Sequence, residues 1–149
     1  MSEKLVLTVP GIPKYVSTVR LAVSSVASHA GLDIEAIEDI RVAVSEACNN
    51  IIEHAGIEGS DYQVICDTYE DRIDITVVDE GVGYDSSAPE AGSAGKPSGN
   101  AADKSAGSPS GTGLGLGIVI MRTLMDEVEM QSEPGSGTSI RMTKYIPAI

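Results

Sequence analysis

Hydrophobic and polar positions repeat with a helical period in two long segments near the start of the chain. Residues 14–30 and 33–55 carry an apolar side chain every three or four positions, which predicts two amphipathic helices. Asp33 is a suitable N-terminal cap for the second helix, and Gly56 follows its predicted end. The two apolar stripes comprise Val16, Val19, Val23, Val26, Ala27 and Ala30 in the first helix, and Ile37, Ile40, Val44, Ala47, Cys48 and Ile51 in the second. We expect both stripes to pack on a core.

Shorter apolar runs between turn residues predict strands. Residues 4–9 form such a run, and Pro10 follows it. Residues 62–69 and 72–79 form two more runs, separated only by Glu70 and Asp71. Because two residues are enough for a tight hairpin, we expect these two strands to pair in antiparallel fashion.

The end of the chain predicts one more helix and a closing hairpin. Residues 113–128 have a helical pattern after a glycine-rich entry, and residues 128–133 and 138–146 read as two strands. The element order β-α-α-β-β-loop-α-β-β predicts an α/β two-layer sandwich, with a mixed, mainly antiparallel sheet and helices on one face. We expect a single domain over residues 1–149.

The stretch from 84 to 112 interrupts this pattern. It contains no Val, Ile, Leu or Met and consists of Gly, Ser, Ala and Pro with a few charged residues. Such a composition cannot pack a core of its own. Long inserts without regular structure inside a domain are usually functional loops or linkers, and we expect a flexible loop that does not divide two cores.

Composition narrows the class of partner and the compartment. The formal net charge is -12 and the pI is about 4.4, so the surface repels phosphate backbones and anionic lipid. We therefore expect neither direct nucleic-acid binding nor a membrane. The N-terminus lacks the pattern of a signal peptide, and no stretch reaches the roughly 20 apolar residues of a membrane span. Cys48 and Cys66, without metal-ligand spacing, are expected to be buried, reduced thiols of a cytoplasmic protein.

The second predicted helix carries polar side chains that packing on a core does not explain. Glu46 and Asn50 lie one turn apart on the side opposite the apolar stripe. An ordinary solvated face is the alternative, but the pair Asn49-Asn50 is a poor choice for the middle of such a helix. A carboxylate beside an amide oxygen suits a proton acceptor together with a hard cation such as Mg2+.

A second candidate site is the end of the strand at Asp79, followed by Gly81 and Gly83. A simple strand-end turn is the alternative, because Asp and Gly are common in turns. An aspartate at a strand end can also accept a hydrogen bond from an exocyclic amine. Nearby glycines let a flat ring approach the backbone.

The third candidate is GTGLGLG at residues 111–117, directly before an apolar helix. It is not a P-loop, because the lysine and hydroxyl of GxxxxGK[ST] are missing. The spacing also departs from GxGxxG, which excludes the dinucleotide fold. Free backbone amides at a helix N-terminus are a suitable phosphate site. A loose loop-to-helix junction is the alternative, although each helical glycine costs about 1 kcal/mol relative to alanine.

These segments, in this order, resemble the motifs of the GHKL (Bergerat-fold) ATP-binding superfamily. EACNN is similar to its N box, DEGVG to its G1 box and GTGLGLG to its G2 box, with residues 84–112 in the place of the ATP lid. GSGTSIRM at 135–142 is similar to the closing threonine-containing segment. Over nearly the whole chain, the sequence resembles the anti-sigma factor serine kinases of the RsbW type. The segments that carry this resemblance are VRLAVSSVASHAG, IEDIRVAVSEACNNIIEHA, TLMDEV and IRMTKYI.

The resemblance implies a role for each motif residue. Glu46 is implied as the general base for a substrate serine, and Asn50, with Asn49, as the ligand of Mg2+ at the ATP phosphates. Asp79 is implied as the acceptor for the adenine amino group. Arg20 is a candidate contact to a sigma factor, with an ordinary solvated arginine as the alternative. Further ATP contacts are implied for Gly81 and Gly83 at the ring pocket, Thr138 at the adenine, and the amides of Gly113, Leu114, Gly115, Leu116 and Gly117 at the phosphates.

The implied function is that of an anti-sigma factor that is also a serine-protein kinase. Such a protein binds a sigma factor, phosphorylates a serine of its anti-sigma factor antagonist with Mg-ATP, and forms a homodimer. Two other functions stay open: a nonenzymatic anti-sigma module that binds ATP, and a generic GHKL ATPase or sensor histidine-kinase-like catalytic domain. Histidine kinases match less well, because no dimerisation helix with a phosphoacceptor histidine precedes the domain.

Overall fold

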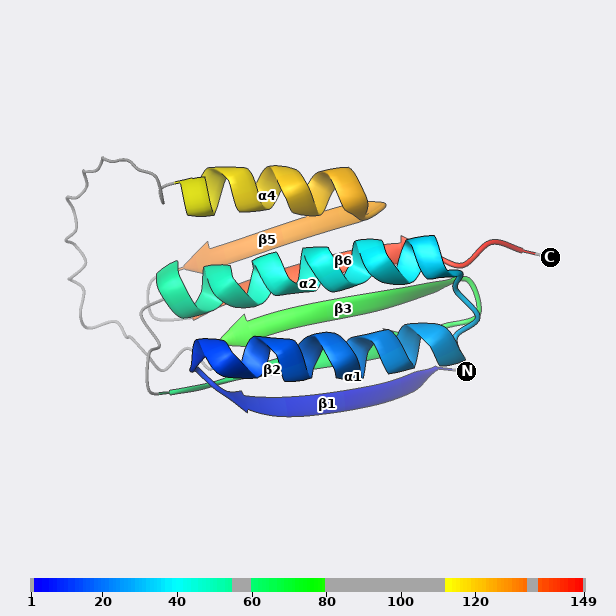
Figure 1. The fold of residues 1–149 in the computed structure, drawn as a ribbon, viewed down its shortest axis with the longest axis horizontal. Coiled ribbons are helices and arrows are strands. Elements are labelled where there is room, and N and C mark those ends of the chain that lie inside the picture. Colours follow the sequence, from blue (N-terminus) through cyan, green and yellow to red (C-terminus); the bar gives the residue numbers. More distant parts are fainter. Residues whose placement is uncertain (1, 55–59, 80–111, 134–136, 149) are drawn as a thin grey trace.

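Residues 2–54, 60–79, 112–133 and 137–148 are described in the computed structural model, and they form one sheet with a layer of helices on it (Figure 1). The first half contains the strand β1, a short 3-10 helix η1 and two long helices. The elements in chain order are β1 (Glu3–Pro10), η1 (Pro13–Tyr15), α1 (Val16–His29), α2 (Ile34–His54), β2 (Asp61–Thr68), β3 (Arg72–Asp79), α4 (Thr112–Leu124), β5 (Glu127–Glu133) and β6 (Gly137–Tyr145).

The five described strands form one sheet in the order β1-β2-β3-β6-β5, and every described pairing is antiparallel. The two-layer α/β fold with helices on one face is therefore confirmed, and no parallel pair occurs among these strands. The register places one apolar row across the whole sheet, which faces the helices. This row consists of Leu7, Val64, Val77, Ile140 and Met130.

The core lies between this sheet face and the helices. Its largest fully buried side chain is Tyr62 on β2. The predicted apolar stripe of α2 is buried from Ile40 to Ile51, with Ile37 partly buried at its start. The predicted cap is also confirmed, because Oδ1 of Asp33 accepts a hydrogen bond from the N–H of Ala36 at 2.9 Å. No helix in the described ranges is long and apolar enough to span a membrane.

Both cysteines are buried, as predicted, and neither forms a disulfide. Burial raises the pKa of the Cys48 thiol on α2 to about 12, and the neighbouring hydroxyl of Tyr62 offsets part of this increase. Burial also raises the pKa of Cys66 on β2 to about 11, with a smaller contribution from the charge of Asp67. Both thiols therefore stay protonated at neutral pH, and they act as small apolar side chains.

The last helix ends earlier than the sequence pattern predicts. We expected a helix over residues 113–128, but α4 ends at Leu124 and β5 begins at Glu127. The apolar spacing continues to Val128, which fits a helix and a strand equally well. Pairing with β6 decides between them, because Val128 lies opposite Met142 and the N–H of Asp126 donates to the carbonyl of Thr143 at 2.9 Å.

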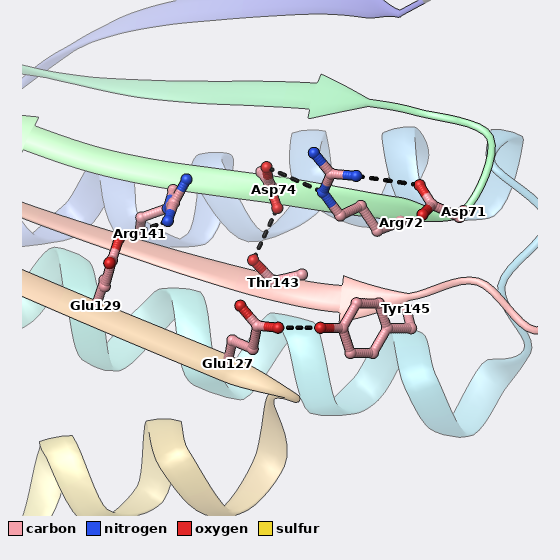
Figure 2. A network of polar contacts seen from close by, with 8 residues as sticks. All are labelled: Asp71, Arg72, Asp74, Glu127, Glu129, Arg141, Thr143 and Tyr145. Carbon is pink, nitrogen blue, oxygen red and sulfur yellow. Dashed lines mark hydrogen bonds and ion pairs between the residues drawn. The ribbon is translucent and has the colours of Figure 1, made fainter.

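The sheet face away from the helices carries a network of polar side chains (Figure 2). Oγ1 of Thr143 donates to Oδ1 of the buried Asp74 at 2.7 Å, and Nε of Arg72 lies 3.5 Å from Oδ2 of the same carboxylate. Beside this cluster the hydroxyl of Tyr145 donates to the carboxylate of Glu127. The network joins β3, β6 and β5 across the uncovered face, so it contributes to the register of the strands that support the candidate site.

Candidate functional site

The predicted site segments come together at one end of the molecule. The C-terminal half of α2, the end of β3, the beginning of α4 and the beginning of β6 all lie at the left in Figure 1. The register supports this placement, because Val78 near the end of β3 lies opposite Ser139 near the start of β6. Segments separated by up to about 90 residues in the sequence therefore form one region.

Asn50 is the most unusual polar residue of this region. Only 7 % of it is exposed, and neither Oδ1 nor Nδ2 has a hydrogen-bond partner within the described part of the chain. Buried side-chain amides are normally hydrogen-bonded, since an unpaired polar group in the interior costs free energy. This burial argues against a merely solvated face on α2. It favours a bound ligand or metal ion as the partner of the Asn50 side-chain amide.

Glu46 and Asn49 lie on α2 near Asn50, and both are half-buried. Glu46 and Asn50 are one helical turn apart, so their side chains are neighbours on the helix surface. The side of α2 opposite its apolar stripe is covered in part by α4, because Gly117 lies against the side chain of Glu46. The pair therefore combines a carboxylate that can accept a proton with a buried amide that can accept a cation.

Gly117 on α4 is the residue that brings this helix close to Glu46. Gly117 is buried, and a Cβ atom at its position would lie 3.0 Å from Oε1 of Glu46. A Cβ atom at the exposed Gly115 would meet nothing within 4 Å. Sequence reasoning assigned Gly117 only to phosphate binding and missed this contact. The four-residue spacing between Gly113 and Gly117 was a usable signal, because it leaves one helix face without side chains.

Asp79 ends β3 in a buried position, with 2 % of the residue exposed. Its Oδ2 accepts a hydrogen bond from the backbone N–H of Thr138 on β6 at 3.2 Å. The hydroxyl of Thr138 lies 3.0 Å from the hydroxyl of Ser132 on β5. The two residues that the sequence assigns to the adenine contact are therefore in direct contact with each other.

Residues 112–117 of the glycine-rich segment form the first turns of α4. Because α4 begins at Thr112, the backbone N–H groups of Thr112, Gly113 and Leu114 have no acceptor within the helix. The N–H of Gly115 is the first that the helix pattern pairs, as the N–H of Ile37 is at the start of α2. Those of Leu116 and Gly117 lie in the second turn, where the helix itself provides acceptors. This geometry favours Gly113 and Leu114 as the predicted residues whose amides are available to an anion.

Some predicted residues lie outside the described ranges. Gly81 and Gly83 belong to this group, as does the predicted loop over 84–112 except for Thr112. Arg20 on α1 lies within the described ranges. Its Nη1 donates to the hydroxyl of Ser45 on α2 at 3.4 Å, so it occupies the junction between the two helices.

The described residues fit the groups that the sequence motifs imply. In the described ranges, no group of three or more His, Cys, Asp or Glu side chains is placed to hold a metal ion. An unpaired Asn50 oxygen suits Mg2+ that is also bound by phosphates, because Mg2+ in nucleotide sites takes few protein ligands. The buried Asp79 suits a hydrogen-bond donor such as an amine.

Comparison with known proteins gives a consistent result. The sequence model of the histidine kinase-like ATPase domain matches residues 9–144. The chain is 39% identical to the serine-protein kinase RsbW of Bacillus pumilus, over 94% of this chain and 84% of that protein. For the RsbW proteins of Halalkalibacterium halodurans and Bacillus subtilis the identities are 39% and 36%, each over 97% of this chain and over 84% and 87% of those proteins.

One solved structure has a similar fold. It is the crystal structure of the RsbU and RsbW domains of a Mycobacterium tuberculosis protein, with a TM-score of 0.64 and 18% sequence identity. The similarity covers 98% of this chain and 33% of that longer chain. At this identity the likeness concerns the arrangement of helices and strands alone.

Proposed function

Because the chain belongs to the histidine kinase-like ATPase domain family, and within it to the RsbW serine-protein kinases, we propose that it transfers the γ-phosphoryl group of ATP to a serine of a small protein. The observation that carries the proposal is the pair on α2. Glu46 is half-buried, and one turn away Asn50 is buried with an unpaired amide. A phosphoryl-transfer site of this kind uses both a proton acceptor and a metal ligand.

Glu46 is the general base in this proposal. The serine hydroxyl loses its proton to the Glu46 carboxylate as its oxygen forms a bond to the γ-phosphorus. The bond between that phosphorus and the β–γ bridging oxygen breaks, and ADP leaves with the electron pair. The half-buried position of Glu46 on a helix supports this role, because partial burial limits the positions that its carboxylate can take up.

Asn50 holds Mg2+ in the proposal, and Asn49 assists it. Bound Mg2+ supplies charge neutralisation at the phosphates of ATP. Asp79 accepts a hydrogen bond from the adenine amino group, and Thr138 holds Asp79 in place through its N–H. The first-turn amides of α4 bind the phosphates. Gly81 and Gly83 are proposed to form the pocket for the adenine ring, and only the resemblance of their motif supports this role.

The proposed protein partners are a sigma factor and an anti-sigma factor antagonist, the latter being the phosphoacceptor. Phosphorylation stops the antagonist from competing with the sigma factor. We propose Arg20 as a sigma factor contact, since it lies at the junction of α1 and α2 beside Ser45. A homodimer and a cytoplasmic location belong to the same proposal.

The decisive experiment is a phosphoryl-transfer assay. The protein is incubated with γ-labelled ATP, Mg2+ and its candidate anti-sigma factor antagonist. We expect phosphoserine on that protein, and a loss of at least about a hundred-fold in kcat for Glu46→Gln, because a positioned base contributes roughly 100- to 10,000-fold.

Three outcomes would contradict the proposal. ATP binding without any transfer would indicate a nonenzymatic binding module. Label on a histidine would indicate the sensor-kinase class. Full activity of Glu46→Gln would remove Glu46 as the base. Arg41→Gln is a suitable control for α2, because Arg41 is paired with Glu38 at 2.8 Å and lies outside the proposed site.

A further inference from the structure

The contact between α4 and α2 at Gly117 concerns the reactive end of Glu46 and not its stem. The atom closest to a Cβ at Gly117 is Oε1 of Glu46, at 3.0 Å, whereas Cβ of Glu46 is at 3.9 Å. A separation of 3.9 Å is an ordinary carbon–carbon contact, but a methyl group 3.0 Å from a carboxylate oxygen is too close. A side chain at position 117 would therefore displace the carboxylate before it disturbed the packing of the two helices.

Glycine at this position lowers the stability of the helix, and the helix can form without it. In the interior of a helix glycine is about 1 kcal/mol less favourable than alanine. Gly117 does not need unusual backbone dihedrals, since the only glycines with positive φ in the described ranges are Gly31 and Gly137. Its N–H lies in the second turn of α4, where an anion has less access to it. Space for the Glu46 carboxylate is the remaining requirement that glycine meets.

We propose that Gly117 is a positioning residue for the phosphoryl-transfer step: the lack of a side chain at this position lets the Glu46 carboxylate take up the place from which it accepts the serine proton. This inference rests on the proposed function of Glu46 as the base. It assigns Gly117 a role different from that of Gly113 and Leu114, whose backbone amides are offered to phosphates. Gly115 provides the contrast within the same helix, because a methyl group there meets nothing within 4 Å.

The test is the substitution Gly117→Ala, together with the larger Gly117→Val. The carboxylate is the end of a flexible side chain, so it is expected to move by a few tenths of an ångström for alanine and further for valine. We expect kcat for phosphoserine formation to fall about ten-fold for Gly117→Ala and about a hundred-fold for Gly117→Val, because displacements of this size disturb reactive geometry. The Kd for Mg-ATP is expected to stay within two-fold of the wild-type value.

Stability is the second readout, and it separates positioning from folding. Alanine has the higher helix propensity, so Gly117→Ala is expected to keep or raise Tm. Gly115→Ala gives the same change in propensity on the same helix and serves as the stability control. Val119→Ala, at an exposed position of α4, is expected to retain the wild-type kcat.

A double substitution gives a specific rescue. Glu46→Asp shortens the side chain by one methylene group and withdraws the carboxylate from position 117. We therefore expect Gly117→Ala to lower kcat by less than two-fold in the Glu46→Asp background, compared with about ten-fold in the wild-type background. A purely structural role of Gly117 would give the same factor in both backgrounds.

The outcomes separate this inference from the proposed function. If Glu46→Gln is inactive and Gly117→Ala keeps the wild-type kcat, the inference fails and the base assignment stands. A fall in Mg-ATP affinity that matches the fall in kcat would also overturn the inference, since Gly117 would then serve nucleotide binding. If Glu46→Gln is fully active, or the wild type transfers no phosphoryl group, the proposed function fails and the inference fails with it.

Discussion

The backbone N–H of Thr138 donates a hydrogen bond to Oδ2 of Asp79 at 3.2 Å, and this contact joins the end of β3 to the start of β6. Asp79 is almost completely buried, with 2 % of the residue exposed. A backbone donor fixes the orientation of the carboxylate independently of the side chain of Thr138. The position proposed for adenine recognition is therefore built from two neighbouring strands and not from a loop.

Asp79→Asn is expected to weaken ATP binding while the fold is kept. The amide oxygen of asparagine can still accept the hydrogen bond from Thr138, but its NH2 group is a donor and repels the adenine amine. A hydrogen bond to a charged group contributes about 1.5–3 kcal/mol, so the Kd for ATP should rise about ten- to hundred-fold, measured by titration calorimetry. Ser132→Ala, which removes only the hydroxyl beside Thr138, should change Kd by less than two-fold. Equal losses for the two variants would contradict this assignment.

Lys144 is expected to anchor the end of α4. Its Nζ donates to the carbonyl of Leu124 at 2.5 Å and lies 3.4 Å from the carboxylate of Asp39 on α2. Lys144→Met leaves both acceptors without this donor and should lower the free energy of unfolding by about 1–3 kcal/mol, measured by urea denaturation. Asp39→Asn keeps the contact between Lys144 and Leu124 and should lower the free energy of unfolding by less. A larger loss for Asp39→Asn would show that the pair between Lys144 and Asp39 is the more important contact.

Stability is expected to decrease at high pH because of Cys48. Burial raises the pKa of its thiol from 9.0 to about 12, so between these values the folded protein retains a proton that the unfolded chain releases. This contribution to the free energy of unfolding is complete below pH 9 and is lost as the pH rises toward 12, by about 1.4 kcal/mol per pH unit. The difference in unfolding free energy between wild type and Cys48→Ala should therefore narrow from pH 9 to pH 11. A constant difference over this range would show that the thiol does not titrate differently in the two states.

The helices and strands of this chain were predictable where the pattern is local and unambiguous. The stripe from Ile40 to Ile51, the cap at Asp33 and the hairpin turn at Glu70 and Asp71 all follow from residues close together in the sequence, and the structure has each of them. The end of α4 was not predictable in this way. The pattern around Val128 suits a helix or a strand, and the pairing with Met142, 14 positions further along, decides it.

The candidate site was also predictable from the sequence only in part. The identity and order of Glu46, Asn50, Asp79 and the glycine-rich segment were determined by the sequence, because each belongs to a short motif whose chemistry can be recognised from the residues alone. Tertiary structure decided that Asn50 is buried without a partner in the described ranges, and that Thr138 contacts Asp79. It also decided that Gly117 faces the carboxylate of Glu46. These relationships depend on how α4 and β6 pack against α2 and β3. The spacing of Gly113 and Gly117 indicates a helix face without side chains, but the residue that lies against this face is decided by packing between segments far apart in the sequence.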